Sequence, residues 1–271
     1  MKKNRRLFLS GLLLALLATL MSACSATTDA NQTPMSTNGS TETGASPSPT
    51  RTVEPSESTE VEPSSEVESL ACDLPLPVSS DWPVVLCETF DNNRNNWIIE
   101  SQDNPFSNYA IDIQDGKYAL SYTAKAFAGF QRAALTWFDV PPAKDFSISV
   151  SGRIDSFFQN TSWGVAFRAA ENSFFLFSID NNNTYAFEIY EGKKWIPLIS
   201  RRPYTGIKPG EDNKLGVFAE GGDFTLFIND VEVNRFSGGQ LEDDGILLVV
   251  SASEGSNAQF FFDDIVLQTQ P

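Results

Sequence analysis

The chain has 271 residues, with 35 acidic and 19 basic side chains and a net charge of −16. A surface this acidic repels phosphate groups, which excludes nucleic acid and anionic lipid headgroups as natural partners. The sequence contains no histidine, and this excludes Ser-His-Asp and Cys-His nucleophilic machinery together with His-ligated zinc. Only carboxylates remain for acid and base chemistry.

The first residues have the pattern of a bacterial export signal. A cationic start with Lys2, Lys3, Arg5 and Arg6 precedes an apolar run over 7–20. This run is roughly 14 residues long, too short to span a bilayer comfortably. We therefore expect residues 1–23 to be a signal peptide and the rest of the chain to lie outside the cytoplasm.

The signal closes on Leu20-Met21-Ser22-Ala23-Cys24, which resembles the bacterial lipobox. The resemblance implies that Cys24 is lipidated and becomes the first residue of the mature protein, anchored to a bacterial membrane by its acyl chains. The alternative is an ordinary secretory signal with a coincidental cysteine. The sequence does not tell which membrane would hold the anchor.

Residues 24–70 have the composition of a disordered linker. They are rich in Ser, Thr, Pro and Glu and contain almost no large apolar side chain, so they cannot bury enough surface to offset the entropy of ordering. All five tryptophans follow residue 71, which predicts one folded domain over 71–271. This domain keeps 14 basic and 27 acidic residues, a net charge of −13.

Two cysteines remain for the domain, Cys72 and Cys87. An even pair in an oxidising compartment favours a disulfide. A loop of this size would stabilise the fold by roughly 3 kcal/mol in the chain-entropy model. We expect the bond to secure the irregular start of the domain.

From residue 84 onward, short runs of β-branched and aromatic residues alternate with small or polar ones, as in Tyr118, Leu120 and Tyr122. Three further runs alternate in the same way: Phe146, Ile148 and Val150; Leu215, Val217 and Ala219; Phe224, Leu226 and Ile228. Residues tolerant of positive φ separate the runs at 114–116, 191–192, 221–222 and 229–230. No long helix is visible. About thirteen strands predict an all-β, two-sheet antiparallel sandwich.

The order of these segments resembles a known fold family. The segments are Trp163 to Arg168, Phe174 to Asp180, Tyr185 to Trp195, Lys214 to Val217, Asp223 to Val233 and Phe262 to Val266. Together they look like a concanavalin A-like jelly roll. More narrowly, they are similar to laminin-G-like domains, including the 3-keto-disaccharide hydrolase-like group found on bacterial surface lipoproteins. The resemblance implies a curved sandwich whose concave sheet, in many members, binds carbohydrate.

An enzyme on this fold would resemble the laminarinase-type glucanases, which carry their acid and nucleophile on one strand as Glu-x-Asp-x-Glu or a bulged variant. A retaining mechanism needs two carboxylates about 5 Å apart, and alternate strand positions supply that spacing. The nearest candidates, Glu188 and Glu191, are three apart and fall on opposite faces of a regular strand. We therefore expect no enzymatic activity, with a carboxylate-dependent glycoside hydrolase as an alternative.

Sugar binding needs aromatic rings that stack on pyranose C–H edges and planar polar groups that bind hydroxyls. Each aromatic could instead pack in the core. The two strongest candidates are Trp163 and Trp195. The full set of glycan candidates is Trp137, Trp163, Arg168, Tyr185, Tyr190, Trp195, Arg201 and Tyr204.

A structural calcium is a further possibility. In many jelly rolls such an ion joins an early acid to an acid of the last strand, and Glu88, Asp91 and Asp263 match that arrangement. The loop that begins at Asp91 resembles an EF-hand only at first, because Asn96 replaces the required Gly and Gln102 the required Glu. The alternative is an Asx-rich turn at 91–96, with backbone capping and a β-bulge at Asp263-Asp264. No other cofactor is expected.

The sequence thus predicts a lipid-anchored, cell-surface jelly-roll domain that binds glycan or acts as an adhesion module. A structural module that binds a surface protein is the alternative. It would present an exposed apolar patch of several hundred Å² in place of a polar-lined groove.

Overall fold

A computed structural model describes residues 76, 81–125, 129–134 and 144–270. The predicted signal peptide, Cys24, Cys72, nearly all of the linker and Trp137 lie outside these residues. The lipidation and the disulfide therefore stay predictions. Among the described residues, no helix is long and apolar enough to cross a membrane.

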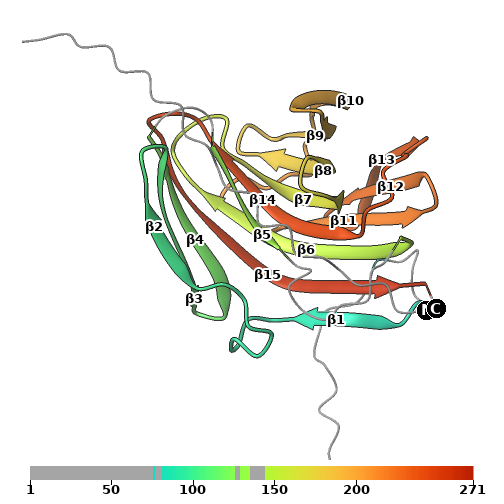
Figure 1. Cartoon of the computed structure of the whole chain (residues 1–271), viewed down its shortest axis with the longest axis horizontal. Helices are drawn as coiled ribbons and strands as arrows, with labels where there is room; N and C mark the ends of the chain where they lie inside the picture. The colour runs from blue at the N-terminus through green and yellow to red at the C-terminus, as the bar shows by residue number, and fades with distance from the viewer. Residues whose placement is uncertain (1–75, 77–80, 126–128, 135–143, 271) are drawn as a thin grey trace, which may run out of the picture. The chain divides into compact units, whose positions relative to one another are not determined.

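The described residues form fifteen β-strands and no helix (Figure 1). Their bounds are β1 Val84–Glu88, β2 Glu100–Asp103, β3 Ser107–Gln114, β4 Lys117–Ala124, β5 Gly129–Ala134, β6 Phe146–Asp155, β7 Ser162–Ala169, β8 Ser173–Asp180, β9 Thr184–Glu191, β10 Lys194–Pro203, β11 Asn213–Glu220, β12 Asp223–Ile228, β13 Val231–Ser237, β14 Gly245–Ala252 and β15 Asn257–Thr269. The sequence predicted about thirteen. The four residues of β2 are all exposed, so that strand has no hydrophobic alternation to reveal it.

The strands build two antiparallel sheets, as predicted. The nine-stranded sheet has the order β13-β12-β11-β6-β15-β4-β3-β2, with β1 paired to β15. The six-stranded sheet has the order β10-β9-β8-β7-β14-β5. Strand order is far from chain order, because β14 lies between β7 and β5 and β15 lies between β6 and β4.

The core lies between the sheets. The alternating residues of β4, β6, β11 and β12 are all buried there, as their pattern predicts. Phenylalanines from both sheets meet in it: the rings of Phe167 and Phe224 lie 5.1 Å apart, and those of Phe175 and Phe224 lie 5.0 Å apart. Each fully buried side chain of this size stabilises the fold by about 1.5–3 kcal/mol.

Two-residue turns with positive φ connect the hairpins. Asp115 and Gly116 join β3 to β4 with φ of 52° and 71°. Asn229 and Asp230 join β12 to β13 with φ of 51° and 64°. These turns have the twist that tight hairpins need, so the turn residues picked out in the sequence are confirmed.

The last strand, β15, is the longest and pairs with β6, β4 and β1. Its pairing with β6 shifts register between Asp263 and Val266. Asp264 has φ of 45°, and its backbone N–H donates to Asp263 Oδ1 at 2.9 Å. This is the bulge and backbone cap that the sequence offered as the alternative to a calcium ligand.

Candidate functional site

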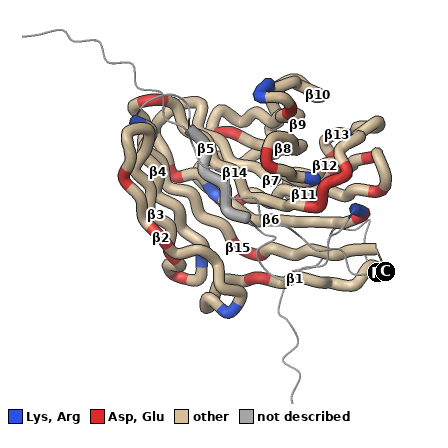
Figure 2. The backbone as a smooth tube through the Cα atoms, viewed as in Figure 1, with Lys and Arg blue, Asp and Glu red and all other residues tan. Residues whose placement is uncertain are grey.

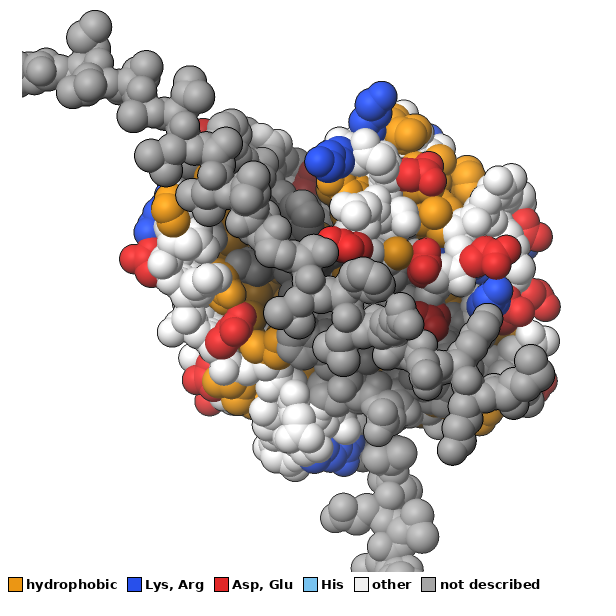
Figure 3. Space-filling view, in the orientation of Figure 1, with side chains coloured by type: hydrophobic (Ala, Val, Ile, Leu, Met, Phe, Trp, Pro, Cys, Tyr) orange, Lys and Arg blue, Asp and Glu red, His pale blue; other side chains and the backbone are white. Residues whose placement is uncertain are grey.

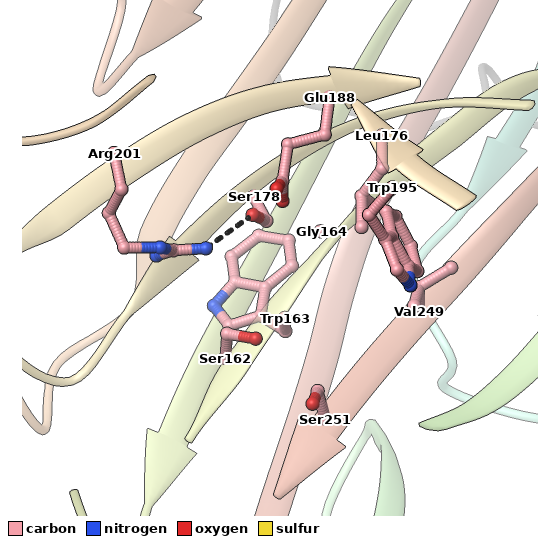
Figure 4. Close-up of a pocket in the computed structure, with 10 residues that line it drawn as sticks. All are labelled: Ser162, Trp163, Gly164, Leu176, Ser178, Glu188, Trp195, Arg201, Val249 and Ser251. Carbon is pink, nitrogen blue, oxygen red and sulfur yellow. Dashed lines mark hydrogen bonds between the residues drawn. The ribbon is translucent and has the colours of Figure 1, made fainter. Parts of the chain in front are cut away.

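A pocket of about 260 Å³ opens on the face of the six-stranded sheet that points away from the core (Figure 4). A second, smaller apolar cluster lies on this face and contains Ala166, Phe174, Leu176, Leu247 and Val249. The pocket is lined by Ser162, Trp163, Gly164, Leu176, Ser178, Glu188, Trp195, Arg201, Val249 and Ser251.

Strand alternation explains how these residues meet. Side chains two apart along a strand point to the same face, and the register aligns them across strands. Ser178 of β8 pairs with Gly164 of β7, and Leu176 pairs with Glu188 of β9. A Cβ at Gly164 would lie 2.3 Å from the Phe177 carbonyl oxygen, so only glycine fits the middle of this pocket.

An aromatic cluster stands at one side of the pocket. Trp195 of β10 pairs directly with Tyr190 of β9, and their ring centroids are 5.0 Å apart. Phe174 lies beneath both rings, at 5.2 Å from Tyr190 and 5.6 Å from Trp195. The Trp195 side chain remains 42% exposed, so it combines a supported ring with a surface that a ligand can reach. In the space-filling view, hydrophobic side chains are exposed on the surface around the β9–β10 hairpin (Figure 3).

Arg201 lines the pocket from β10 and is held in place by protein partners. Its Nη1 donates to Asp180 Oδ2 at 2.7 Å, and its Nη2 donates to Ser178 Oγ at 3.3 Å (Figure 4). Asp180 is buried and also accepts from the Thr184 hydroxyl at 2.7 Å. The guanidinium is therefore fixed beside the pocket, with its charge paired.

Glu188 is the remaining charged side chain of the lining. It is half-buried, and no described residue forms a hydrogen bond or ion pair with its carboxylate. Figure 4 shows the carboxylate directed toward the middle of the pocket, near Ser178. The site thus contains an aromatic ring, a fixed guanidinium, serine hydroxyls and an acceptor carboxylate.

Three of the glycan candidates chosen from the sequence meet here, namely Tyr190, Trp195 and Arg201. Trp163 is different and requires a correction. Its side chain is only 1% exposed and packs edge-on against Phe262 at 5.5 Å. The pattern that puts Val165 and Phe167 in the core puts the Trp163 ring there too, so it offers no stacking surface.

Arg168 is also structural. It is 5% exposed, and its guanidinium donates to the carbonyls of Leu241 and Lys144 at 3.1 Å and to that of Gly221. Burial lowers the pKa of Arg168, against the opposing effect of nearby acids. The side chain joins three loops at one end of the sandwich and does not face the pocket.

The structure also corrects the prediction that Tyr185 and Tyr204 bind glycan. Tyr185 is a core residue whose hydroxyl donates to the Val233 carbonyl at 3.3 Å. Tyr204 is half-buried, and its ring packs edge-on against Tyr185 at 6.2 Å. Neither side chain lines the pocket.

The structure does not bring the three calcium candidates together. Glu88 is buried and accepts from the Phe90 N–H and from Trp97 Nε1, both at 2.8 Å. Asp91 accepts from the Thr89 hydroxyl at 2.8 Å. Asp263 pairs with Lys117 at 3.0 Å. Among the described residues, no three acids gather where they could hold a metal ion.

Sequence reasoning missed Ser162, Ser178, Ser251, Leu176 and Val249 as pocket residues, and it considered Glu188 only as half of an acid pair. The signal that could have found them was alternation on β8 and β9, counted from the side chains of the core. Phe177 and Phe187 face the core, so Ser178 and Glu188 face outward.

The pocket lacks the acid pair of a strand-borne retaining mechanism among its described residues. The outward positions of β8 are Phe174, Leu176, Ser178 and Asp180, which provide one carboxylate. That carboxylate is buried and bound to Arg201. Glu188 is the only acid in the described lining.

No protein-family model and no curated protein match the chain. Solved structures do. The laminarinase catalytic domain from Thermotoga maritima MSB8 matches with a TM-score of 0.51 at 10% identity, over 70% of this chain and 99% of that one. Laminarinase from Flavobacterium sp. UMI-01 matches with a TM-score of 0.51 at 11% identity, over 69% and 100%. SCLam, a non-specific endo-beta-1,3(4)-glucanase from family GH16, matches with a TM-score of 0.50 at 9% identity, over 73% and 96%.

The fold is a concanavalin A-like jelly roll. At such low identity the likeness concerns the fold alone, and one fold can have many functions. The narrower resemblance to the 3-keto-disaccharide hydrolase-like group stays a prediction.

Proposed function

We propose that this protein is a non-catalytic glycan-binding module, attached to the outside of a bacterial membrane through a lipid on Cys24. The observation that carries the proposal is that the partly exposed Trp195 ring and several polar groups line the same pocket. A ring supported from below can stack on a sugar, while Ser178, Glu188 and Arg201 supply hydrogen-bond partners for its hydroxyls. The matching laminarinases act on polysaccharide according to their names, which agrees with the proposal.

The test is binding of the purified full chain to a broad immobilised glycan panel, with calcium and with chelator. We expect binding that is independent of calcium. Loss of binding with chelator would show that the described side chains of the pocket do not bind glycan by themselves. Absence of binding in both conditions would overturn the proposal.

The Trp195→Ala variant tests whether glycan binds in this pocket. We expect this change to weaken glycan binding by about tenfold or more, because a truncated aromatic anchor typically costs over 1.4 kcal/mol. Trp82→Ala is the matched control. Trp82 is half-buried and packs on Phe218 of β11, in the other sheet, so its removal should leave the affinity unchanged. Equal losses in both variants would argue against the pocket.

The anchor is tested separately. Cys24→Ser removes the atom that would carry the lipid, and we expect it to shift the protein from the membrane fraction to the soluble fraction of producing cells. A variant that remains fully in the membrane fraction would contradict lipid anchoring at Cys24 without affecting the glycan proposal.

A protein-binding role is the second candidate, supported by exposed aromatics at one end of the sandwich. Phe157 is 101% exposed and Phe106 is 63% exposed. Their loops are attached to paired strand ends. Lys125 N, just after β4, donates to the Phe106 carbonyl, Ser156 Oγ donates to the carbonyl of Asn257 in β15, and Asn257 pairs with Thr123 of β4. If the protein binds no glycan of the panel, the next test uses a Phe157→Ser variant. It compares the surface proteins captured by this variant with those captured by the original protein.

A further inference from the structure

One negative charge in the pocket has no cationic partner among the described residues. The charged side chains of the described lining are Glu188 and Arg201. The Arg201 charge is paired with Asp180 at 2.7 Å. Within the described residues, Glu188 has no such partner, so the pocket with its supporting acid has one net negative charge.

Lys194, the basic residue next to Trp195 in the chain, does not cancel it. Lys194 begins β10, where it pairs with Glu191 in register, and strand alternation directs it to the face opposite Trp195 and Glu188. Figure 2 shows basic residues at this β9–β10 turn and acidic residues distributed over both sheets. The domain as a whole has a charge of −13, which repels anions from the pocket and attracts cations to it.

We infer that the pocket selects a glycan unit with a free, protonated amine over the matching neutral or acidic sugar. Glu188 would accept from the ammonium group while Trp195 stacks on the ring and contributes a cation–π attraction. A uronate or sulfate would instead meet an acceptor carboxylate and a guanidinium that is already paired. The inference rests on the proposed function, since it concerns the same pocket.

The test compares sugars that differ in one group. Glucosamine and galactosamine oligomers with free amines are measured against the corresponding glucose and galactose oligomers, their N-acetylated forms and oligogalacturonate. We expect the full chain to bind the amine forms about three- to tenfold more tightly than the neutral forms, the range of a partly exposed ion pair with a cation–π contact. Oligogalacturonate should bind most weakly.

Glu188→Gln identifies the group responsible. It keeps the size of the side chain and one acceptor oxygen but removes the charge. We therefore expect the ratio of the affinity for amine sugars to that for neutral sugars to fall to about onefold, whatever the change in the affinity for neutral sugars. Glu191→Gln is the matched control. Glu191 is exposed at the end of the same strand, and its loss should leave the preference intact.

Three outcomes would contradict the inference. Equal affinity for amine and neutral sugars would overturn the inference and leave glycan binding in place. An amine preference that survives in Glu188→Gln would also overturn it, because the acidic surface would then be the cause. Absence of binding to every sugar would overturn the proposed function and the inference together.

Discussion

At the scale of single residues, two tryptophans on strands β7 and β10 of one sheet have different roles. Trp163 and Trp195 both line the same pocket, yet one is buried in the core and the other is partly exposed. Trp163 contacts Phe262 across the core and also lies against Gly152 of β6, where an added Cβ would come within 2.8 Å of its ring. Trp163 therefore contributes to the stability of the sandwich, and Trp195 is available to a ligand.

We expect Trp163→Ala to lower the free energy of unfolding by about 3–5 kcal/mol, the usual cost of truncating a buried tryptophan. Trp195→Ala should cost clearly less, because its ring is partly in water before the change. Urea unfolding followed by fluorescence or circular dichroism measures both. Similar losses for the two variants would contradict this division of roles.

At the scale of elements, the β9–β10 hairpin places the aromatic cluster. Its turn consists of Gly192 and Lys193 with φ of 58° and 64°, and it sets the register in which Tyr190 faces Trp195. A side chain at Gly192 would meet nothing within 4 Å. The requirement for glycine at this position is therefore conformational and not steric.

Gly192→Ala should cost about 1 kcal/mol of stability, because an L-residue is forced into a left-handed conformation. We also expect a weaker glycan affinity, since the hairpin that holds Trp195 becomes less well ordered. Lys193→Gly is the control and should leave stability equal or higher, because glycine relieves the positive φ of Lys193. Thermal unfolding and a binding titration of both variants provide the measurements.

The Arg168 cluster is a second connection between elements. Its guanidinium binds three carbonyls from separate loops, a geometry that depends on the planar fork of arginine. Arg168→Lys should therefore lower the free energy of unfolding by about 1.5–3 kcal/mol, the range for hydrogen bonds to a charged group. An unchanged urea midpoint would show that the lysine ammonium group makes up for the hydrogen bonds of the guanidinium.

The alternation of apolar residues was enough to predict the strands, the turns and the two-sheet sandwich. It was not enough to predict the pocket. Phe174, Trp163 and Tyr185 are equally aromatic in sequence, but the face on which each lies depends on which strand pairs with which, and that pairing is set by long-range contacts. Tyr190 and Trp195, both glycan candidates from the sequence, lie side by side because a short hairpin joins them. Ser178 was missed because a serine in a strand has no local signature.

At the scale of the whole molecule, buried tyrosines connect stability to alkaline pH. Burial raises the pKa of Tyr118, and its hydroxyl donates to the Ile98 carbonyl at 3.0 Å. Burial also raises the pKa of Tyr122, and a hydrogen bond to Glu100 raises that of Tyr109. Each folded pKa is above the unfolded value of about 10. The resulting stability is therefore complete below pH 10 and is lost as pH rises above it.

We expect the urea midpoint of the protein to be flat from about pH 8 to pH 9 and to fall steeply above pH 10. Tyr118→Phe should make the alkaline fall shallower, at a cost of about 1 kcal/mol at neutral pH for the lost hydrogen bond. A variant with the same alkaline slope as the original protein would show that Tyr118 does not ionise during unfolding.

The position of β15 also determines the order of events when the chain folds. This strand lies between β6 and β4 and also pairs with β1, so three early strands must wait for a strand that is made after the other fourteen. Folds dominated by such distant pairings close slowly. Until β15 arrives, β1 has no strand to pair with and β4 and β6 each have one edge open, and unpaired edges of this kind attract other chains. Assistance by a chaperone would matter most for this protein in the interval before its final strand joins the sheet.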